Sequence, residues 1–112
     1  MILRNKLIED IISGQISEEE HEIVLKTIRR DLSKIFKEIM PKKFWIFPQN
    51  PYVYCLSNCL CIEMPGYGSE NYLLVLSEIE QQLRKNFSVE THFFDGKITY
   101  LIKKNKNRNL YI

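Results

Sequence analysis

The sequence predicts an α+β fold: two N-terminal helices, a small mixed β-sheet with a crossover helix, and a C-terminal β-hairpin. Two observations support this prediction. Apolar residues recur at helical spacing in two N-terminal segments, and a strong hairpin turn, Asp95-Gly96, lies between alternating segments near the C-terminus. The chain has 112 residues, which suits one core rather than two. We therefore assign residues 1–104 to a single domain and 105–112 to a basic polar tail.

The first two predicted helices lie before Pro41. One helix ends at Gly14, which can adopt the left-handed conformation of a helix terminus. The next helix begins after Ser17, because Ser17 and Glu20 form a capping box, and Pro41 terminates it. The apolar positions are Leu3, Leu7, Ile8, Ile11 and Ile12 in the first helix, and Leu25, Ile28, Leu32, Ile35, Phe36 and Ile39 in the second.

Two segments after Pro41 have the character of strands. Residues 44–47 are aromatic, short and flanked by prolines, which predicts a short edge strand. Residues 53–64 alternate in size and predict one two-sided, central strand, on which Cys55, Cys59 and Cys61 share a face. The alternative is a tight turn at residues 57–58 that divides this segment into two strands.

A third helix and a hairpin complete the predicted fold. Ser69 can cap a helix that carries an apolar stripe and ends near Asn86. If strands 53–64 and 88–94 are parallel neighbours, this helix is a right-handed crossover. The stripe consists of Tyr72, Leu76, Ile79 and Leu83. The Asp95-Gly96 turn pairs Phe93 with Ile98, Thr91 with Tyr100 and Val89 with Ile102 on a face that we expect to point inward.

Charge is distributed unevenly along the chain. Residues 1–96 carry eleven basic and fourteen acidic side chains, whereas every charged residue after Gly96 is basic. The net charge of the whole chain is only +2. The C-terminal part therefore has an electrostatic character of its own.

The three cysteines are odd in number and clustered, unlike those of a secreted disulfide framework. We expect reduced, buried thiols in a reducing, cytoplasmic protein, with no metal, because their spacing matches no common zinc motif. No apolar run is long enough to span a membrane. His21 and His92 are far apart and lie in no nucleophile motif, so we predict no enzymatic activity, no catalytic residue and no cofactor.

These features favour a small binding module that acts through protein contacts, with another protein or with itself as a homodimer. On the hairpin face opposite the apolar one, apolar side chains are surrounded by positive charge. The predicted partner-binding residues are Phe94, Lys97, Thr99, Leu101 and Lys103. A second candidate anchor is the aromatic group Phe44, Trp45 and Phe47, which is either exposed or part of the core.

The alternative is a nucleic-acid-binding protein. Basic side chains recur along the outer side of the second helix and again in the tail, where they can neutralise phosphates. They are Lys26, Arg29, Arg30, Lys34, Lys37, Lys104, Lys106 and Arg108. The low net charge of the whole chain counts against this alternative.

Overall fold

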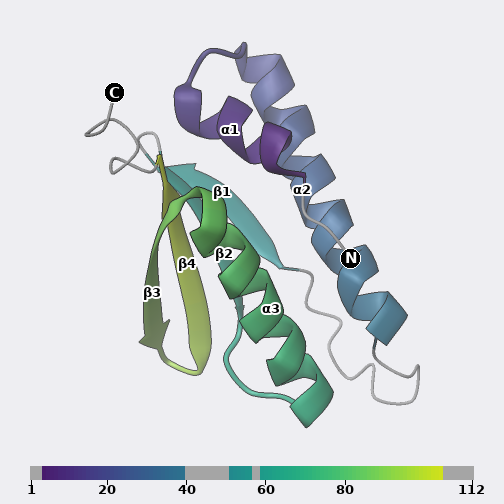
Figure 1. Ribbon diagram of the computed structural model, residues 1–112. Coiled ribbons are helices and arrows are strands. Elements are labelled where there is room, and N and C mark those ends of the chain that lie inside the picture. Colours follow the sequence, from purple (N-terminus) through teal and green to yellow (C-terminus); the bar gives the residue numbers. More distant parts are fainter. Residues whose placement is uncertain (1–3, 40–50, 57–58, 105–112) are drawn as a thin grey trace.

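A computed structural model describes residues 4–39, 51–56 and 59–104 (Figure 1). Within these residues the predicted α+β fold class is confirmed. The elements are α1 (Asn5–Ser13), α2 (Glu18–Ile39), β1 (Tyr52–Leu56), β2 (Cys59–Pro65), α3 (Glu70–Asn86), β3 (Ser88–Phe94) and β4 (Lys97–Lys103). The predictions for residues 44–47 and 105–112 lie outside the described residues.

The four strands form one sheet in the order β1-β2-β4-β3, and every neighbouring pair is antiparallel. The described strands therefore pair differently from the predicted mixed sheet. β2 and β3 do run parallel and α3 joins them, but they are not neighbours, because β4 lies between them. The crossover helix, α3, is thus present. The second strand of the hairpin, β4, lies between the two strands that α3 connects.

The segment predicted as one strand is two strands, β1 and β2, so the two-strand alternative is correct, and residues 57–58 between them lie outside the described residues. Leu56 lies opposite Cys59, and the chain reverses between them. The reversal changes which residues share a face. Cys55 faces the same side as Leu60, whereas Cys61 faces the same side as Tyr54.

The predicted helix boundaries agree closely with the structure. The Ser17 Oγ accepts a hydrogen bond from the Glu20 N–H at 3.2 Å, and α2 begins there. The Ser69 Oγ accepts one from the Tyr72 N–H, also at 3.2 Å, at the start of α3. Gly14 ends α1 in the left-handed conformation, with φ of 69°. Each boundary is set by residues within one helical turn of it, two through a serine side chain and one through the backbone of Gly14.

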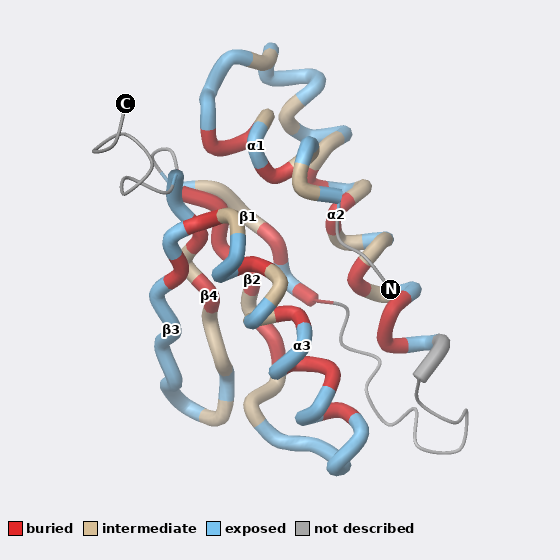
Figure 2. The backbone as a smooth tube through the Cα atoms, in the orientation of Figure 1, coloured by how far each residue is buried: buried red, intermediate tan, exposed pale blue. Residues whose placement is uncertain are grey.

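All three helices pack on one face of the sheet, which we call the inner face. The buried strand residues that belong to the common core all point to this side, in register across the four strands. Figure 2 shows the difference between the largely buried β2 and the exposed edge strand β3. The core residues of the strands are Val53, Leu60, Ile62, Met64, Val89, Tyr100 and Ile102.

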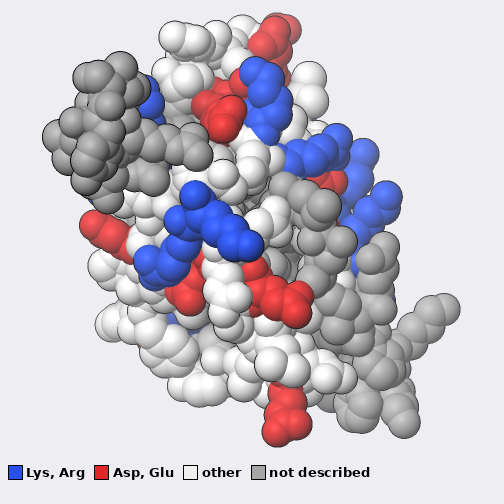
Figure 3. Space-filling view, in the orientation of Figure 1, with Lys and Arg blue, Asp and Glu red and all other residues white. Residues whose placement is uncertain are grey.

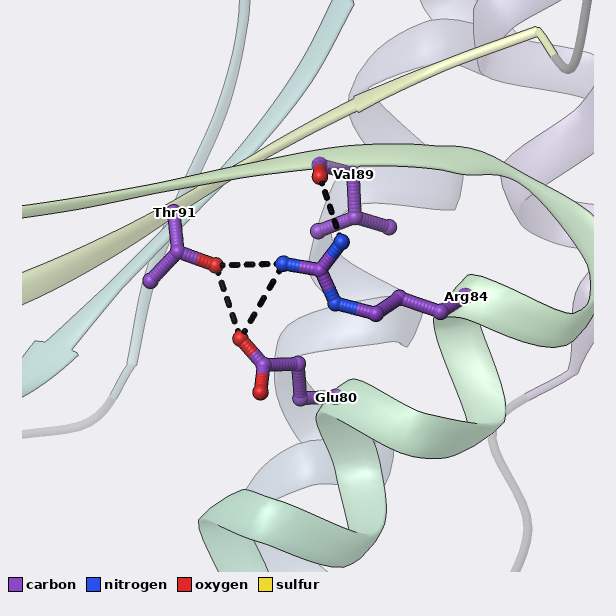
Figure 4. Close-up of polar contacts among 4 residues, drawn as sticks. All are labelled: Glu80, Arg84, Val89 and Thr91. Carbon is purple, nitrogen blue, oxygen red and sulfur yellow. Dashed lines mark hydrogen bonds and ion pairs between the residues drawn. The ribbon is translucent and has the colours of Figure 1, made fainter.

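A polar network attaches the edge strand β3 to α3 (Figure 4). Arg84 donates a hydrogen bond from Nη1 to the Val89 carbonyl oxygen at 2.9 Å and one from Nη2 to the Thr91 Oγ1 at 3.1 Å. The Thr91 hydroxyl donates in turn to the Glu80 carboxylate at 2.7 Å. This network explains how a polar residue fits on the inner face of β3.

The predicted register of the β3–β4 hairpin is confirmed at all three cross-strand pairs. The expectation that this whole face points into the core is wrong near the turn. Phe93 is on the inner face but 56% exposed. Its ring packs edge-on against the Tyr67 ring, with 5.7 Å between the two ring centroids. Thr91 is also exposed. The part of β3 near the turn thus lacks the cover that buries Val89.

The turn between β3 and β4 generates a prediction about stability. Asp95 and Gly96 both have positive φ, 51° and 75°, and a Cβ on Gly96 would lie 3.1 Å from the Tyr67 Cε2. We expect Gly96→Val to lower the free energy of unfolding by roughly 1–3 kcal/mol, because a β-branched residue is strained at positive φ. Urea denaturation measures this, with Asp95→Gly as a control that permits the turn. An unchanged midpoint for Gly96→Val would contradict the turn geometry.

Candidate binding surface

The sheet face opposite the helices, which we call the outer face, is the candidate site. No helix in the described part of the chain covers it, because the strand residues in the core all belong to the inner face. The strand register brings side chains from all four strands together on this side. They are Tyr52, Tyr54, Leu56, Cys59, Cys61, Glu63, Glu90, His92, Phe94, Lys97, Thr99, Leu101 and Lys103.

The structure places all five predicted partner-binding residues on the outer face. Phe94 and Lys97 are cross-strand partners beside the turn, and Thr99, Leu101 and Lys103 follow at alternate positions of β4. Phe94 is 82% exposed, whereas Leu101 is half-buried between its neighbours. The hairpin therefore presents one exposed aromatic anchor and one partly covered aliphatic side chain.

Sequence reasoning missed the contribution of β1 to this face. Tyr52 is 59% and Leu56 57% exposed, and the Tyr52 and Tyr54 rings lie 5.0 Å apart. These side chains join the outer face only because β1 folds back along β2. The signal that could have found them is the turn at residues 57–58, which was predicted only as an alternative.

Charges on the outer face are mixed rather than basic. Lys97 forms an ion pair with Glu63 across the strands at 3.4 Å. His92 lies 3.5 Å from the Glu90 carboxylate. Lys103 is the second lysine of the face, so its two lysines are matched by two glutamates. This balance suits contact with a protein surface better than contact with a phosphate backbone.

The cysteines do not share a face as predicted. Cys55 points inward and is half-buried, whereas Cys59 and Cys61 are buried on the outer face, because the chain reverses between β1 and β2. Burial, with Cys59 beside it, raises the pKa of the Cys61 thiol to about 11. The described residues contain no cluster of three or more His, Cys, Asp or Glu that could hold a metal ion. A thiol that stays protonated at neutral pH is a poor nucleophile and metal ligand.

The predicted nucleic-acid-binding residues are brought together only in part. Four of them are exposed on α2, and Figure 3 shows basic side chains over this helix with acidic ones among them. Arg29 is half-buried, and its Nη2 reaches the Val53 carbonyl oxygen of β1. Lys104 follows β4, whose end lies away from the middle of α2 in Figure 1. Lys106 and Arg108 lie outside the described residues. The four on α2 are Lys26, Arg30, Lys34 and Lys37.

None of the helices described here is long and apolar enough to cross a membrane. Comparisons of the chain with protein-family models, with curated proteins and with solved structures find no match.

The buried thiol predicts a pH dependence of stability. The Cys61 pKa rises from 9.0 to about 11 on folding, so the unfolded chain loses this proton first as the pH rises. The corresponding stability is complete below pH 9 and is lost between pH 9 and pH 11. Between pH 9 and pH 11, we expect the free energy of unfolding to decline less in the Cys61→Ala variant than in the unsubstituted chain, as measured by urea denaturation. Thiolate absorbance from a folded Cys61 below pH 9 would refute the proposed burial.

Proposed function

We propose that this protein is a non-enzymatic binding module that acts through protein–protein contacts on its outer sheet face. One observation carries the proposal. The exposed side chains of Tyr52 and Leu56 on β1 and of Phe94 on the β3–β4 hairpin occupy a single face that no described helix covers. Apolar anchors among charged groups of both signs are typical of protein interfaces.

The charges of this face favour a protein partner, and a second copy of the chain is the first partner to test. Two lysines and two glutamates leave no excess charge that would repel an identical face. Two-fold dimers bury the same patch on both subunits, so a patch must tolerate its own charges.

A second candidate function is nucleic-acid binding through α2. The supporting observation is that Lys26, Arg30 and Lys34 are all exposed at intervals of one helical turn. Weighing against it, Asp31 of the same helix accepts two hydrogen bonds from Arg4 at 2.8 Å, and three glutamates occupy the first turn of α2. The basic stripe is therefore short and has carboxylates at its border.

The self-association test is size-exclusion chromatography with light scattering over a range of concentrations. We expect the mass to rise from 13.4 kDa towards twice that value. Phe94→Ala combined with Leu101→Ala should weaken the dimer by at least about thirtyfold, since truncating an interface anchor typically costs about 2 kcal/mol. Added salt should have a modest effect. Ile23→Ala is the matched control, because Ile23 is a similarly exposed apolar residue on α2.

Two results would contradict the proposal. One is a dimer that the Phe94 and Leu101 substitutions weaken no more than Ile23→Ala does. The other is a monomer that binds a random RNA or DNA fragment, with an affinity that falls roughly a thousandfold between about 50 and 200 mM salt. Loss of that binding when Lys26, Arg30 and Lys34 are changed to Glu would identify α2 as the functional surface.

A further inference from the structure

A polar groove lies between α2 and the edge strand β1, apart from the hairpin anchors. Its volume is about 380 Å³, and it is lined by residues from successive turns of α2 and by residues 52–55 of β1. This volume is at the lower end of the roughly 300–1,000 Å³ of small-molecule sites. The groove is therefore large enough for a small ligand or a single functional group.

Arg29 is the central side chain of this groove. Its Nη2 donates a hydrogen bond to the Val53 carbonyl oxygen at 3.5 Å, the long limit for such a bond. Its Nε is buried and has no hydrogen-bond partner in the described part of the chain. A guanidinium has five N–H donors, so most of the hydrogen-bonding capacity of Arg29 is not used by these contacts. Buried donors normally have partners, which makes this one an exception that needs explanation.

The other groups of the lining favour an anion. Lys26 lines the same groove one helical turn before Arg29, and His21 also contributes. Glu22 is the carboxylate of the lining, so two permanent cations oppose one permanent anion. On the opposite wall, the groove is lined by Tyr52, Val53 and Tyr54 of β1.

We propose that this groove binds an oxyanion, the carboxylate or phosphate group of a small ligand, with Arg29 as its principal partner. A guanidinium presents two parallel N–H groups, which match two oxygens of either group. Lys26 adds positive charge beside it. Phe94 and Leu101, the hairpin anchors of the proposed protein contact, are not part of the groove lining, whereas Tyr52 and Tyr54 belong to both surfaces.

The test is an NMR titration of the full-length, isotope-labelled chain at constant ionic strength, with inorganic phosphate in one series and acetate in the other. We expect a saturable shift of the Arg29 Nε–H resonance and of backbone amides in α2 and β1. Arg29→Lys keeps the charge but loses the two-pronged geometry, and should raise the Kd about tenfold. Lys26→Gln, at an exposed position that does not threaten folding, should weaken binding severalfold. Lys34→Gln removes a cation outside the groove and should leave the Kd unchanged.

The two series distinguish the source of the oxyanion. Saturation by phosphate alone identifies a phosphate ligand, and saturation by acetate identifies a carboxylate ligand. The proposal is overturned if neither probe gives a saturable shift. It is also overturned if Lys34→Gln weakens binding as much as Lys26→Gln does, because the effect would then be general attraction to a basic helix.

Discussion

Burial of one sheet face beneath all three helices is the constraint on which the rest of the structure depends. Leu60, Ile62 and Ile102, in the two central strands, are fully buried on this face. Such a core requires every strand to present its apolar alternate positions to the same side, since neighbouring residues of a strand point in opposite directions. The opposite set of side chains, including Phe94 and Leu101, therefore forms the outer face.

Features with local signals could be predicted from the sequence. Ser17, Ser69 and Gly14 mark helix ends through contacts within one turn, and Asp95-Gly96 determines the hairpin register through its own backbone preferences. The order of the strands could not be predicted in this way, because it depends on contacts between distant segments. The reversal between β1 and β2 was predicted only as an alternative, since Ser-Asn is a weaker turn signal than Asn-Gly.

The same distinction applies to the candidate surfaces. The five hairpin residues were found because the position of the Asp95-Gly96 turn is enough to determine which residues of β3 and β4 share a face. Tyr52 and Leu56 were missed, because their place on the outer face depends on the β1–β2 pairing. Arg29 was predicted as a possible nucleic-acid-binding residue of the basic side of the helix. Its contact with Val53 depends on where β1 lies relative to α2, which the pattern of charges along the helix does not contain.

Two adjacent residues of β4 provide the most direct test of the division between an inner core face and an outer contact face. Leu101 points outward opposite Glu90, whereas Ile102 points inward and is fully buried. Thermal unfolding of Leu101→Lys and Ile102→Lys compares them. We expect Leu101→Lys to unfold cooperatively with a midpoint within about 5 °C of the unsubstituted chain, and Ile102→Lys to lose cooperative unfolding, because it buries an unpaired charge. Equal destabilisation by the two substitutions, or a greater effect of Leu101→Lys, would contradict this account.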